Sequence, residues 1–512
     1  MSNDEHSSPP TASELDAAEM PAVAGLPVRY RRAPLFGLVA LALVPVAALA
    51  ALLVWSDAQA DEYETRSQVE PETFTPASEP VPALTTSMLD YRRSPATLAR
   101  QGADHELATS IEQLAAFVDA RSCLAVSVNG RVVSSWNGDV AVIPASTNKL
   151  LIAGAATEIL GPDSRFTTSV AASAPVDGVV EGDLYLVGGG DPLLAATDFP
   201  PDVNGPPAAS TTSLDTLADA VVAAGITSIG GAIVGDASRY DDQFVNPTWA
   251  GGVAFVDAGP VGGLLVNDGQ TVGRSGRQRD PGEAAAREFS RLLRDRGVSV
   301  SNGWESGVLE PGTPVIATVE SAPLSAIVAD MLTRSDNDTA EMLLKEIGYV
   351  AADEGTTEAG LRVLDLTVRS WGTAMDDVVL ADGSGLSANN RLTCDTLVGV
   401  LVHLESTSAV SGLAVAGRSG TLVDQFLDTP AEGRLIAKTG TLSNPPADAD
   451  PPEVKALAGY LEAPDGDMLE LALVLNGPGY VTADGYLPFW GALAERLVAF
   501  PEGPTVDQLG PR

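Results

Sequence analysis

One stretch near the N-terminus decides where the rest of the chain can fold. Residues 35–55 form a run of 21 positions without a charged side chain, which is long enough to cross a bilayer as a helix. Arg29, Arg31 and Arg32 precede the run and acidic residues follow it, a polarity that keeps the N-terminus in the cytoplasm. We therefore expect a disordered cytoplasmic tail at 1–33, a membrane segment at 34–55 and a proline-rich acidic linker at 56–83.

The sequence leaves the fate of this segment open. Ala58-Gln59-Ala60 resembles a signal-peptidase site, so the segment is either a retained anchor or a leader removed after Ala60. We favour the anchor because the apolar run is long for a leader. In both cases the bulk of the chain is exported, either to the extracytoplasmic face of the membrane or into the surroundings of the cell.

Composition excludes several classes of function. The formal net charge of −38 argues against nucleic-acid binding, which needs clustered Lys and Arg. With three histidines and two cysteines the chain has no metal-ligand spacing, and we expect no metal and no cofactor. We expect Cys123 and Cys394 to be buried apolar residues, and the sequence leaves a single bridge between them open.

The segment Ser146-Thr147-Asn148-Lys149 begins an apolar stretch at 150–160 that is typical of a helix. If the helix starts here, Ser146 and Lys149 share one face, and the amine can take a proton from the hydroxyl. The alternative is a serine N-cap followed by a lysine in the first turn. Lysine usage favours the chemistry, because only four of the 30 basic residues are Lys. A buried lysine can lose its proton, whereas arginine cannot.

Two further motifs lie downstream. Ser335-Asp336-Asn337 falls on a short loop between a helix at 323–332 and a helix that starts at Asp338, and an ordinary N-cap turn is the alternative there. Lys438-Thr439-Gly440-Thr441 lies within an alternating run at 434–442, which predicts a strand.

The order of the predicted elements indicates an α+β fold. A hairpin of strands at 123–128 and 131–136 turns at Asn129-Gly130, two strands at 456–461 and 468–475 come late, and helices lie between them. This order implies a sheet closed by joining the two ends of one domain, 84–166 plus 319–512. Residues 167–318 are dense in Gly, Ala, Val and Asp, and we expect an inserted β-rich domain there.

The combination of motifs carries a resemblance. S-x-x-K, S-x-N and K-T-G, with the stretches 382–387, 417–422 and 456–460, resemble the D-alanyl-D-alanine carboxypeptidase/endopeptidase family. These are the low-molecular-mass class C penicillin-binding proteins, similar to peptidase family S13. The likeness covers about residues 84–498. It implies a penicillin-binding/β-lactamase-like transpeptidase domain, an antiparallel sheet flanked by helices.

The resemblance also implies a role for each motif. Ser146 would attack the carbonyl between two D-alanines to form an acyl-enzyme, with Lys149 as its base. Ser335 and Asn337 would pass a proton to the leaving amine and hold the substrate. The strand would bind the terminal carboxylate, and the N–H groups of Ser146 and Thr441 would form the oxyanion hole. The strand residues with these roles are Lys438, which belongs to the catalytic set, and the substrate-binding Thr439, Gly440 and Thr441.

Partners follow from the same resemblance: peptidoglycan stem peptides as substrate, β-lactam antibiotics as inhibitors, and the membrane through the N-terminal segment. A cleaved chain would be secreted to the cell wall. A β-lactamase is one alternative, although no glutamate between S-x-N and K-T-G has Asn four positions later, as E-x-x-x-N requires. A penicillin-binding wall protein without turnover is another, and the intact motifs disfavour it.

Two departures from the family pattern concern substrate preference. Ser146 and Ser335 are 189 positions apart, which is short for members with two inserted domains and implies that one insertion is reduced or absent. After Thr441, the acidic, proline-rich stretch 444–454 lengthens the connection to the next strand.

Overall fold

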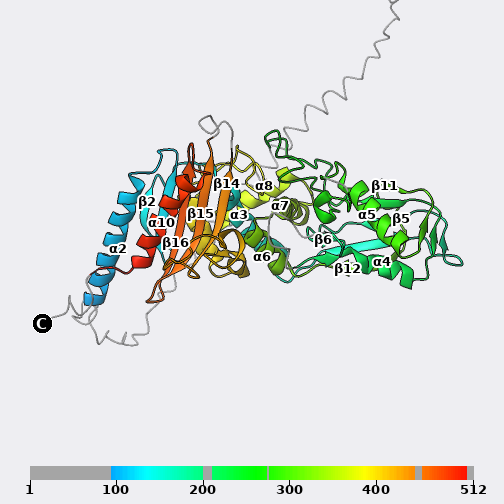
Figure 1. Cartoon of the computed structure of the whole chain (residues 1–512), viewed down its shortest axis with the longest axis horizontal. Coiled ribbons are helices and arrows are strands. Elements are labelled where there is room, and N and C mark those ends of the chain that lie inside the picture. The colour runs from blue at the N-terminus through cyan, green and yellow to red at the C-terminus, as the bar shows by residue number, and fades with distance from the viewer. Residues whose placement is uncertain (1–93, 200–209, 274–275, 444–451, 504–512) are drawn as a thin grey trace, which may run out of the picture. The chain divides into compact units, whose positions relative to one another are not determined.

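The computed structural model describes residues 94–199, 210–273, 276–443 and 452–503 (Figure 1). The chain divides into a unit of residues 1–87 and a unit of residues 88–512, and all described residues belong to the second. The predicted tail, membrane segment and linker lie outside the described residues. Within the described part, no helix combines the length and apolar character that a bilayer span requires.

The main sheet has six strands in the order β13-β14-β15-β16-β1-β2. β1 pairs antiparallel with β2 across the Asn129-Gly130 turn and with β16 on its other side. The start and end of the described chain therefore meet in one sheet, as the sequence predicts. The strands are β1 (Cys123–Val128), β2 (Arg131–Trp136), β13 (Ala414–Val415), β14 (Leu435–Leu442), β15 (Val454–Glu462) and β16 (Met468–Asn476).

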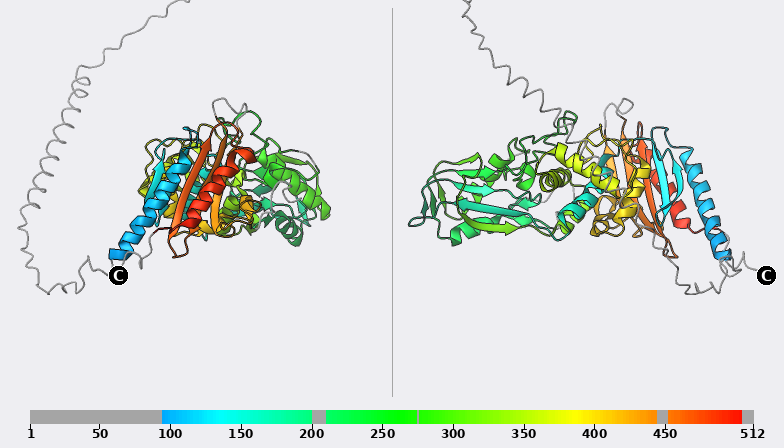
Figure 2. Two further views of the ribbon diagram at one scale, coloured as in Figure 1. Left: turned by 60° about the vertical axis from the view of Figure 1, so that its left-hand side comes forward. Right: turned by 180° about the vertical axis from the view of Figure 1, so that it is seen from behind.

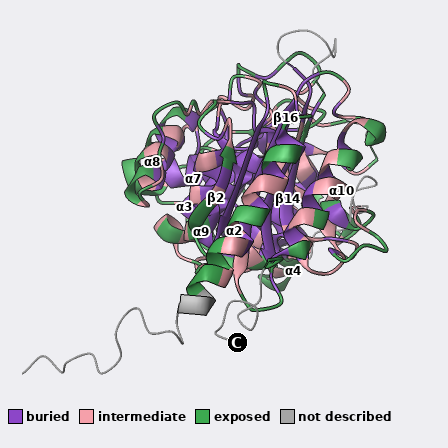
Figure 3. Cartoon of the chain, turned by 90° about the vertical axis from the view of Figure 1, so that its left-hand side faces the viewer, coloured by how far each residue is buried: buried purple, intermediate pink, exposed green. Residues whose placement is uncertain are grey.

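Alternation along the strands divides the apolar side chains between two cores. On β16, Leu471 and Leu473 face a core shared with α2 (Ser94–Ala115) and α10 (Ala483–Ala499). Ala472 and Val474 face the opposite core, shared with α3, α6, α7, α8 and α9. The sheet is thus a buried middle layer with helices on both faces (Figures 2 and 3). The helices of the second face are α3 (Lys149–Leu160), α6 (Leu324–Arg334), α7 (Asn337–Ala352), α8 (Thr357–Ser370) and α9 (Cys394–Leu404).

A disulfide joins Cys123 on β1 to Cys394 at the start of α9. Both residues are fully buried, as expected, and they form the single bridge that the sequence left open. The physical reason is tertiary: closing the sheet brings β1 beneath the start of α9, and the two Cα atoms lie 5.8 Å apart despite a separation of 271 residues.

The segment between β3 and β12 builds further sheets around its own apolar core. β3 and β12 pair antiparallel, with Thr167 opposite Glu320, so the chain leaves and returns at one place. The larger sheet has the order β11-β9-β5-β3-β12 and includes parallel pairs, with α4 and α5 packed against it. The boundaries 167–318 for an inserted domain stay a prediction.

The remaining elements complete the chain. The strands of this segment are β3 (Thr167–Ala172), β4 (Val179–Val180), β5 (Leu184–Val187), β6 (Leu194–Ala195), β7 (Thr212–Ser213), β8 (Ser228–Ile229), β9 (Ile233–Asp236), β10 (Ser299–Val300), β11 (Trp304–Ser306) and β12 (Val315–Glu320). Its helices are α4 (Leu214–Ala223) and α5 (Pro281–Asp295), and the short 3₁₀ turns are η1 (Ala145–Asn148), η2 (Asn267–Gly269), η3 (Ser408–Gly412) and η4 (Gly420–Leu422).

Candidate active site

Ser146 lies in the 3₁₀ turn η1 that leads into α3. Ala145 before it has φ 48°, in the left-handed region that non-glycine residues rarely adopt, and such backbone strain concentrates at functional sites. The N-cap positions of η1 and α3 belong to Pro144 and Asn148, and neither turn has a side-chain cap hydrogen bond. Ser146 is therefore not the helix cap that the sequence left as an alternative.

Lys149, the first residue of α3, is fully buried beneath this turn. Its Nζ atom donates to Ser146 Oγ at 3.0 Å, to Asn337 Oδ1 at 2.7 Å and to the Ser384 carbonyl at 2.6 Å. These three acceptors use all three N–H bonds of an ammonium group. Burial lowers the pKa of Lys149 to about 8, although nearby carboxylates, with that of Asp382 first among them, act in the opposite direction.

The Ser335-Asp336-Asn337 loop connects α6 and α7 beside Lys149. Ser335 ends α6 with φ 62°, and Asp336 is the N-cap of α7, with its side chain accepting a hydrogen bond from the Thr339 N–H. The N-cap turn is thus real, but it is formed by Asp336 and leaves the two neighbours available. Asn337 uses its oxygen for Lys149, while its Nδ2 atom donates to the Asp257 carbonyl at 2.9 Å.

β14 brings the third predicted motif to the same place. Lys438 is fully buried, and its Nζ atom donates to Ser335 Oγ at 2.7 Å and to the Thr439 carbonyl at 2.7 Å. Burial, and next the charges of Lys149 and Lys455, hold the pKa of Lys438 well below its usual range. The site therefore contains two lysine–serine pairs. Lys149 and Ser146 form the first at the start of α3, and Lys438 of β14 forms the second with Ser335 at the end of α6.

Glycine is required where these segments touch. A Cβ atom on Gly440 would lie 2.9 Å from the Pro144 carbonyl oxygen, because β14 passes directly beside the turn that carries Ser146. Gly385 has φ +86°, and a Cβ atom there would lie 2.0 Å from the Ala145 carbonyl oxygen. The two glycines therefore allow the backbone of β14 and of the 382–387 loop to close around the nucleophile turn.

Glu341 on α7 binds the 382–387 loop, in which the Ser384 carbonyl accepts a hydrogen bond from Lys149. Its Oε1 atom accepts from the backbone N–H groups of Gly383 at 3.1 Å and Ser384 at 2.7 Å. Burial, and next the charge of Asp382, raise the pKa of Glu341 to about 7, against the opposing effect of these hydrogen bonds. Sequence reasoning missed Glu341, because a glutamate inside an amphipathic helix carries no motif.

The predicted side chains open into a cavity of about 220 Å³. Ser146 and Ser335 line it, and so do Thr439 and Thr441 of β14. Lys149 and Lys438 lie beneath this surface and contact it through the two serine hydroxyls. The rest of the wall consists of residues to which the sequence analysis gave no role. They are Thr421, Gln425, Lys455, Tyr486 and Trp490.

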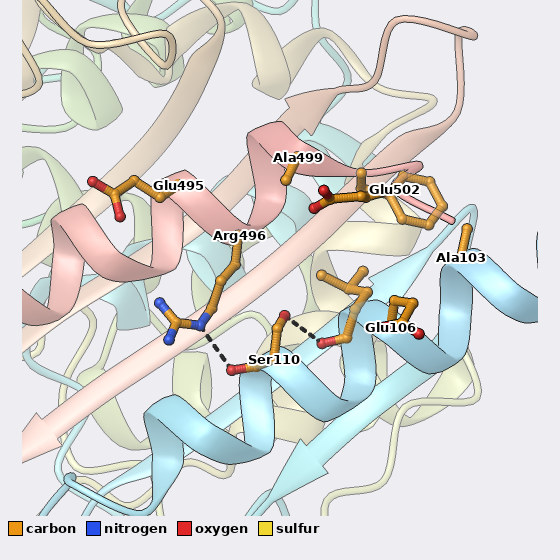
Figure 4. Close-up of a pocket in the computed structure, with 9 residues that line it drawn as sticks. Ala103, Glu106, Ser110, Glu495, Arg496, Ala499 and Glu502 are labelled. Carbon is orange, nitrogen blue, oxygen red and sulfur yellow. Dashed lines mark hydrogen bonds between the residues drawn. The ribbon is translucent and has the colours of Figure 1, made fainter. Parts of the chain in front are cut away.

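A second cavity, of about 230 Å³, lies between α2 and α10 (Figure 4). Glu106, Glu495 and Glu502 line it with Arg496, whose Nε atom donates to the Ser110 carbonyl at 2.7 Å. None of the predicted site residues lines this cavity, and its hydrogen bonds serve to join the two helices. The candidate reaction site is therefore the cavity that contains Ser146.

Comparison with known proteins agrees with this geometry. The family model described as the D-Ala-D-Ala carboxypeptidase 3 (S13) family matches residues 105–271 and 260–485. The D-alanyl-D-alanine carboxypeptidase of an Actinomadura species is 30% identical over 470 residues, covering 74% of this chain and 81% of the relative. Carboxypeptidase DacB of Mycolicibacterium smegmatis is 30% identical over 479 residues, covering 88% and 95%.

The fold has a counterpart among solved structures. Penicillin binding protein 4 of Haemophilus influenzae superposes with a TM-score of 0.63 at 18% identity, covering 76% of this chain and 98% of that chain. At this identity the likeness concerns the fold alone. The family match and the two relatives extend over most of the chain, and the residues of the family match include every predicted motif. The chain therefore belongs to the D-Ala-D-Ala carboxypeptidase 3 (S13) family.

Proposed function

We propose that this protein is a serine peptidase that hydrolyses the terminal D-Ala-D-Ala bond of peptidoglycan stem peptides through an acyl-enzyme on Ser146. The observation that carries the proposal is the contact between Lys149 Nζ and Ser146 Oγ at 3.0 Å. With a pKa of about 8, roughly a tenth of the Lys149 side chains are neutral at pH 7. A neutral amine at this distance is a competent general base for the hydroxyl.

Acylation begins with attack by Ser146 on the peptide carbonyl. Ser146 Oγ forms a bond to the carbonyl carbon of the penultimate D-alanine, and its proton passes to the neutral Lys149 amine. The negative oxygen of the tetrahedral intermediate is stabilised by the backbone N–H groups of Ser146 and Thr441. When the C–N bond breaks, Ser335 gives its proton to the leaving amine and regains one from the Lys149 ammonium, and free D-alanine departs. Water then attacks the acyl ester and gives a proton to the neutral Lys149 amine; the shortened peptide leaves as its carboxylic acid, and the proton returns from Lys149 to Ser146 Oγ.

Ser335 is the group proposed to deliver the proton to the leaving amine. Its hydroxyl lines the same cavity as Ser146 and accepts a hydrogen bond from Lys438 at 2.7 Å. Because Lys438 is the donor in this contact, the hydroxyl proton of Ser335 is free to point elsewhere. Asn337 fixes the orientation of Lys149 through its oxygen while the Asp257 carbonyl holds its other end.

The open edge of β14 supports substrate binding. β13 pairs only with Ile436 and Ala437, so on that edge the stretch 438–442 has no neighbouring strand in the described part of the chain, although β15 pairs with its other edge. Extended peptides commonly bind such an edge by adding a strand. We propose that the stem peptide lies here, with its terminal carboxylate held by Lys438, Thr439 and Thr441.

The same acylation accounts for inhibition by β-lactams, whose strained amide would leave a stable ester on Ser146. A class A β-lactamase, which shares the three motifs, needs in addition a glutamate that activates water for rapid deacylation. No aspartate or glutamate lines the described wall of the cavity, which supports the peptidase over that alternative.

We also propose that the enzyme works outside the cytoplasm, anchored by residues 34–55 or released after Ala60. The Cys123–Cys394 disulfide supports this location, because such bonds persist in oxidising compartments. We further propose that 84–166 plus 319–512 form the catalytic domain. The inserted segment 167–318 would then shape access to the site, to which it contributes the Asp257 carbonyl.

The test is an assay of the full chain with two peptides that differ only in the last residue, D-Ala-D-Ala against D-Ala-L-Ala. We expect free D-alanine from the first, no release from the second, and none from either with Ser146→Ala. D-alanine release that survives the substitution would refute the proposal. Incubation with cross-linked dimers then determines whether the enzyme also acts as an endopeptidase.

A further inference from the structure

The four lysines of this chain have distinct surroundings. Lys345 forms an ion pair with Asp241 at 2.6 Å and serves the packing of α7. Lys149 and Lys438 are buried under the reaction cavity with defined hydrogen bonds. Lys455, on β15, lines the same cavity. Three of the four lysines in a chain with 30 basic residues are thus concentrated at one site, and the third has no assigned role.

Lys455 is held in a defined position beside β14. It lies opposite Thr441 in the sheet, and its Nζ atom donates to Thr441 Oγ1 at 2.9 Å. The same Nζ atom lies 4.3 Å from the ring centre of Tyr486 and 5.3 Å from that of Trp490, both on α10. These aromatic faces attract the cation and fix the direction of its flexible stem.

The charge of Lys455 is not neutralised by a carboxylate. Within the described residues it forms no ion pair with Asp or Glu, although the whole chain carries 68 acidic residues. The wall around it offers hydroxyl and amide groups from Thr439, Thr421 and Gln425. A partly buried cation among neutral donors is the usual arrangement for binding an anion.

The hydrogen bond to Thr441 prepares a second donor for the same anion. Because the ammonium donates to Thr441 Oγ1, the hydroxyl proton of Thr441 is free to point away from Lys455. Thr441 also lines the cavity and is exposed. Lys455 and Thr441 therefore form a pair of donors on one side of the cavity.

Lys438 is less suited to supply this charge alone. It is fully buried, and two of its three N–H bonds are already taken by Ser335 and the Thr439 carbonyl. Burial together with the charges of its two lysine neighbours favours its neutral form. Burial lowers the pKa of Lys455 as well, but less far than that of Lys438, because Lys455 is only partly buried and lines the cavity wall.

We propose that Lys455 is a specificity-determining residue that binds, together with Thr441, the carboxylate on the leaving-group side of the substrate. This inference rests on the proposed function, in which Ser335 protonates the leaving amine. Ser335 and Lys455 line one cavity, so the leaving residue occupies it. The carboxylate of an α-amino acid is two bonds from its amine. A terminal D-amino acid with a free carboxylate is therefore the leaving group that this site selects.

The test compares acylation of the full chain by benzylpenicillin, which has a free carboxylate, and by its methyl ester. For Lys455→Met we expect the second-order rate constant with the acid to fall roughly 10- to 100-fold, the loss typical of a hydrogen bond to a charged group. The rate with the ester should change less than about twofold, because the ester lacks the charge that Lys455 binds. Lys455→Arg should retain most of the preference for the acid.

Two controls separate this role from packing. Arg434 directly precedes β14, about 23 Å along the strand from Thr441. Arg434→Met therefore removes one positive charge far from the cavity and should leave the acid-to-ester ratio unchanged. Thr441→Val removes the second donor and should lower the same ratio. Lys455→Gln, which removes the charge but keeps a polar side chain, gives a second measurement if Lys455→Met is unstable.

An unchanged acid-to-ester ratio in folded Lys455→Met or Lys455→Gln, whether both rates fall equally or neither falls, would overturn the inference while leaving the proposed peptidase intact. Failure of the unsubstituted chain to be acylated by either compound would instead refute the proposed function, and the inference with it.

Discussion

Replacement of Lys149 by arginine tests the proposed base without removing its positive charge. The guanidinium introduced by Lys149→Arg would still donate hydrogen bonds, but such a group does not give up its proton in proteins. If Lys149 only positions Ser146 through hydrogen bonds, the variant should keep much of its activity. If Lys149 takes the proton of Ser146, acylation should disappear.

The magnitude follows from the pKa of about 8 that burial gives Lys149. At pH 7 about one side chain in ten is neutral and able to act as a base. For an arginine with a pKa above 12, the neutral fraction falls to about one in 10⁵ or less. The acylation rate should therefore fall by about four orders of magnitude, which corresponds to about 5 kcal/mol of activation free energy.

The assay is the second-order rate constant for acylation by a fluorescent penicillin, with thermal unfolding measured in parallel. Lys345→Arg is the matched control, because Lys345 is also buried but serves the ion pair with Asp241, and acylation by this variant should stay within a few-fold of the original. A Lys149→Arg enzyme that folds and retains more than about 1% of the acylation rate would refute the role of Lys149 as base.

Four further predictions follow. Acylation by the unsubstituted enzyme should rise about tenfold per pH unit up to a midpoint near 8 and then level, because only the neutral amine is a base; a flat profile between pH 6 and 9 would contradict it. Glu341→Gln removes a negative charge that raises the pKa of that amine, so the midpoint should move to lower pH; an upward shift would contradict the assignment. Gly385→Ala would bring a Cβ atom within 2.0 Å of the Ala145 carbonyl oxygen at a positive φ, so acylation should fall at least 10-fold, and near-normal rates would show that the loop can yield. Cys123→Ser with Cys394→Ser should lower the free energy of unfolding by about 2–5 kcal/mol, measured by urea denaturation, and equal midpoints would show that the bond does not stabilise the fold.

The main sheet was predictable because its strands carry their own signals. The Asn129-Gly130 turn and the alternating strands at both ends of the chain predict the elements, and their order predicts the pairing of β1 with β16. The disulfide was not predictable in the same way. Its two cysteines are 271 positions apart, and only the packing of α9 onto β1 brings them together.

The predicted site residues meet in the structure because each motif lies at an element boundary. Ser146 precedes α3, Ser335 ends α6, and Lys438 lies just beyond the residues of β14 that pair with β13. The spacing within a motif is local and can be seen in the sequence. The approach of one motif to another depends on glycines such as Gly440, whose neighbours across space the sequence does not reveal.

The supporting residues were harder to predict, for two different reasons. Glu341 lies on the buried face of α7, where a carboxylate is stable only because the backbone N–H groups of the 382–387 loop point at it. Nothing local in the sequence indicates that partner. Lys455 did carry a signal, the rarity of lysine, but its place opposite Thr441 depends on the register of β14 and β15.

The most direct test of the account is to locate the acyl group itself. The full chain is incubated with benzylpenicillin, digested with a protease, and the acylated peptide is identified by tandem mass spectrometry. The account predicts a single adduct on Ser146 that disappears in Ser146→Ala and is lost in Lys149→Arg. An adduct on any other residue, or the absence of an adduct on a folded enzyme, would contradict it.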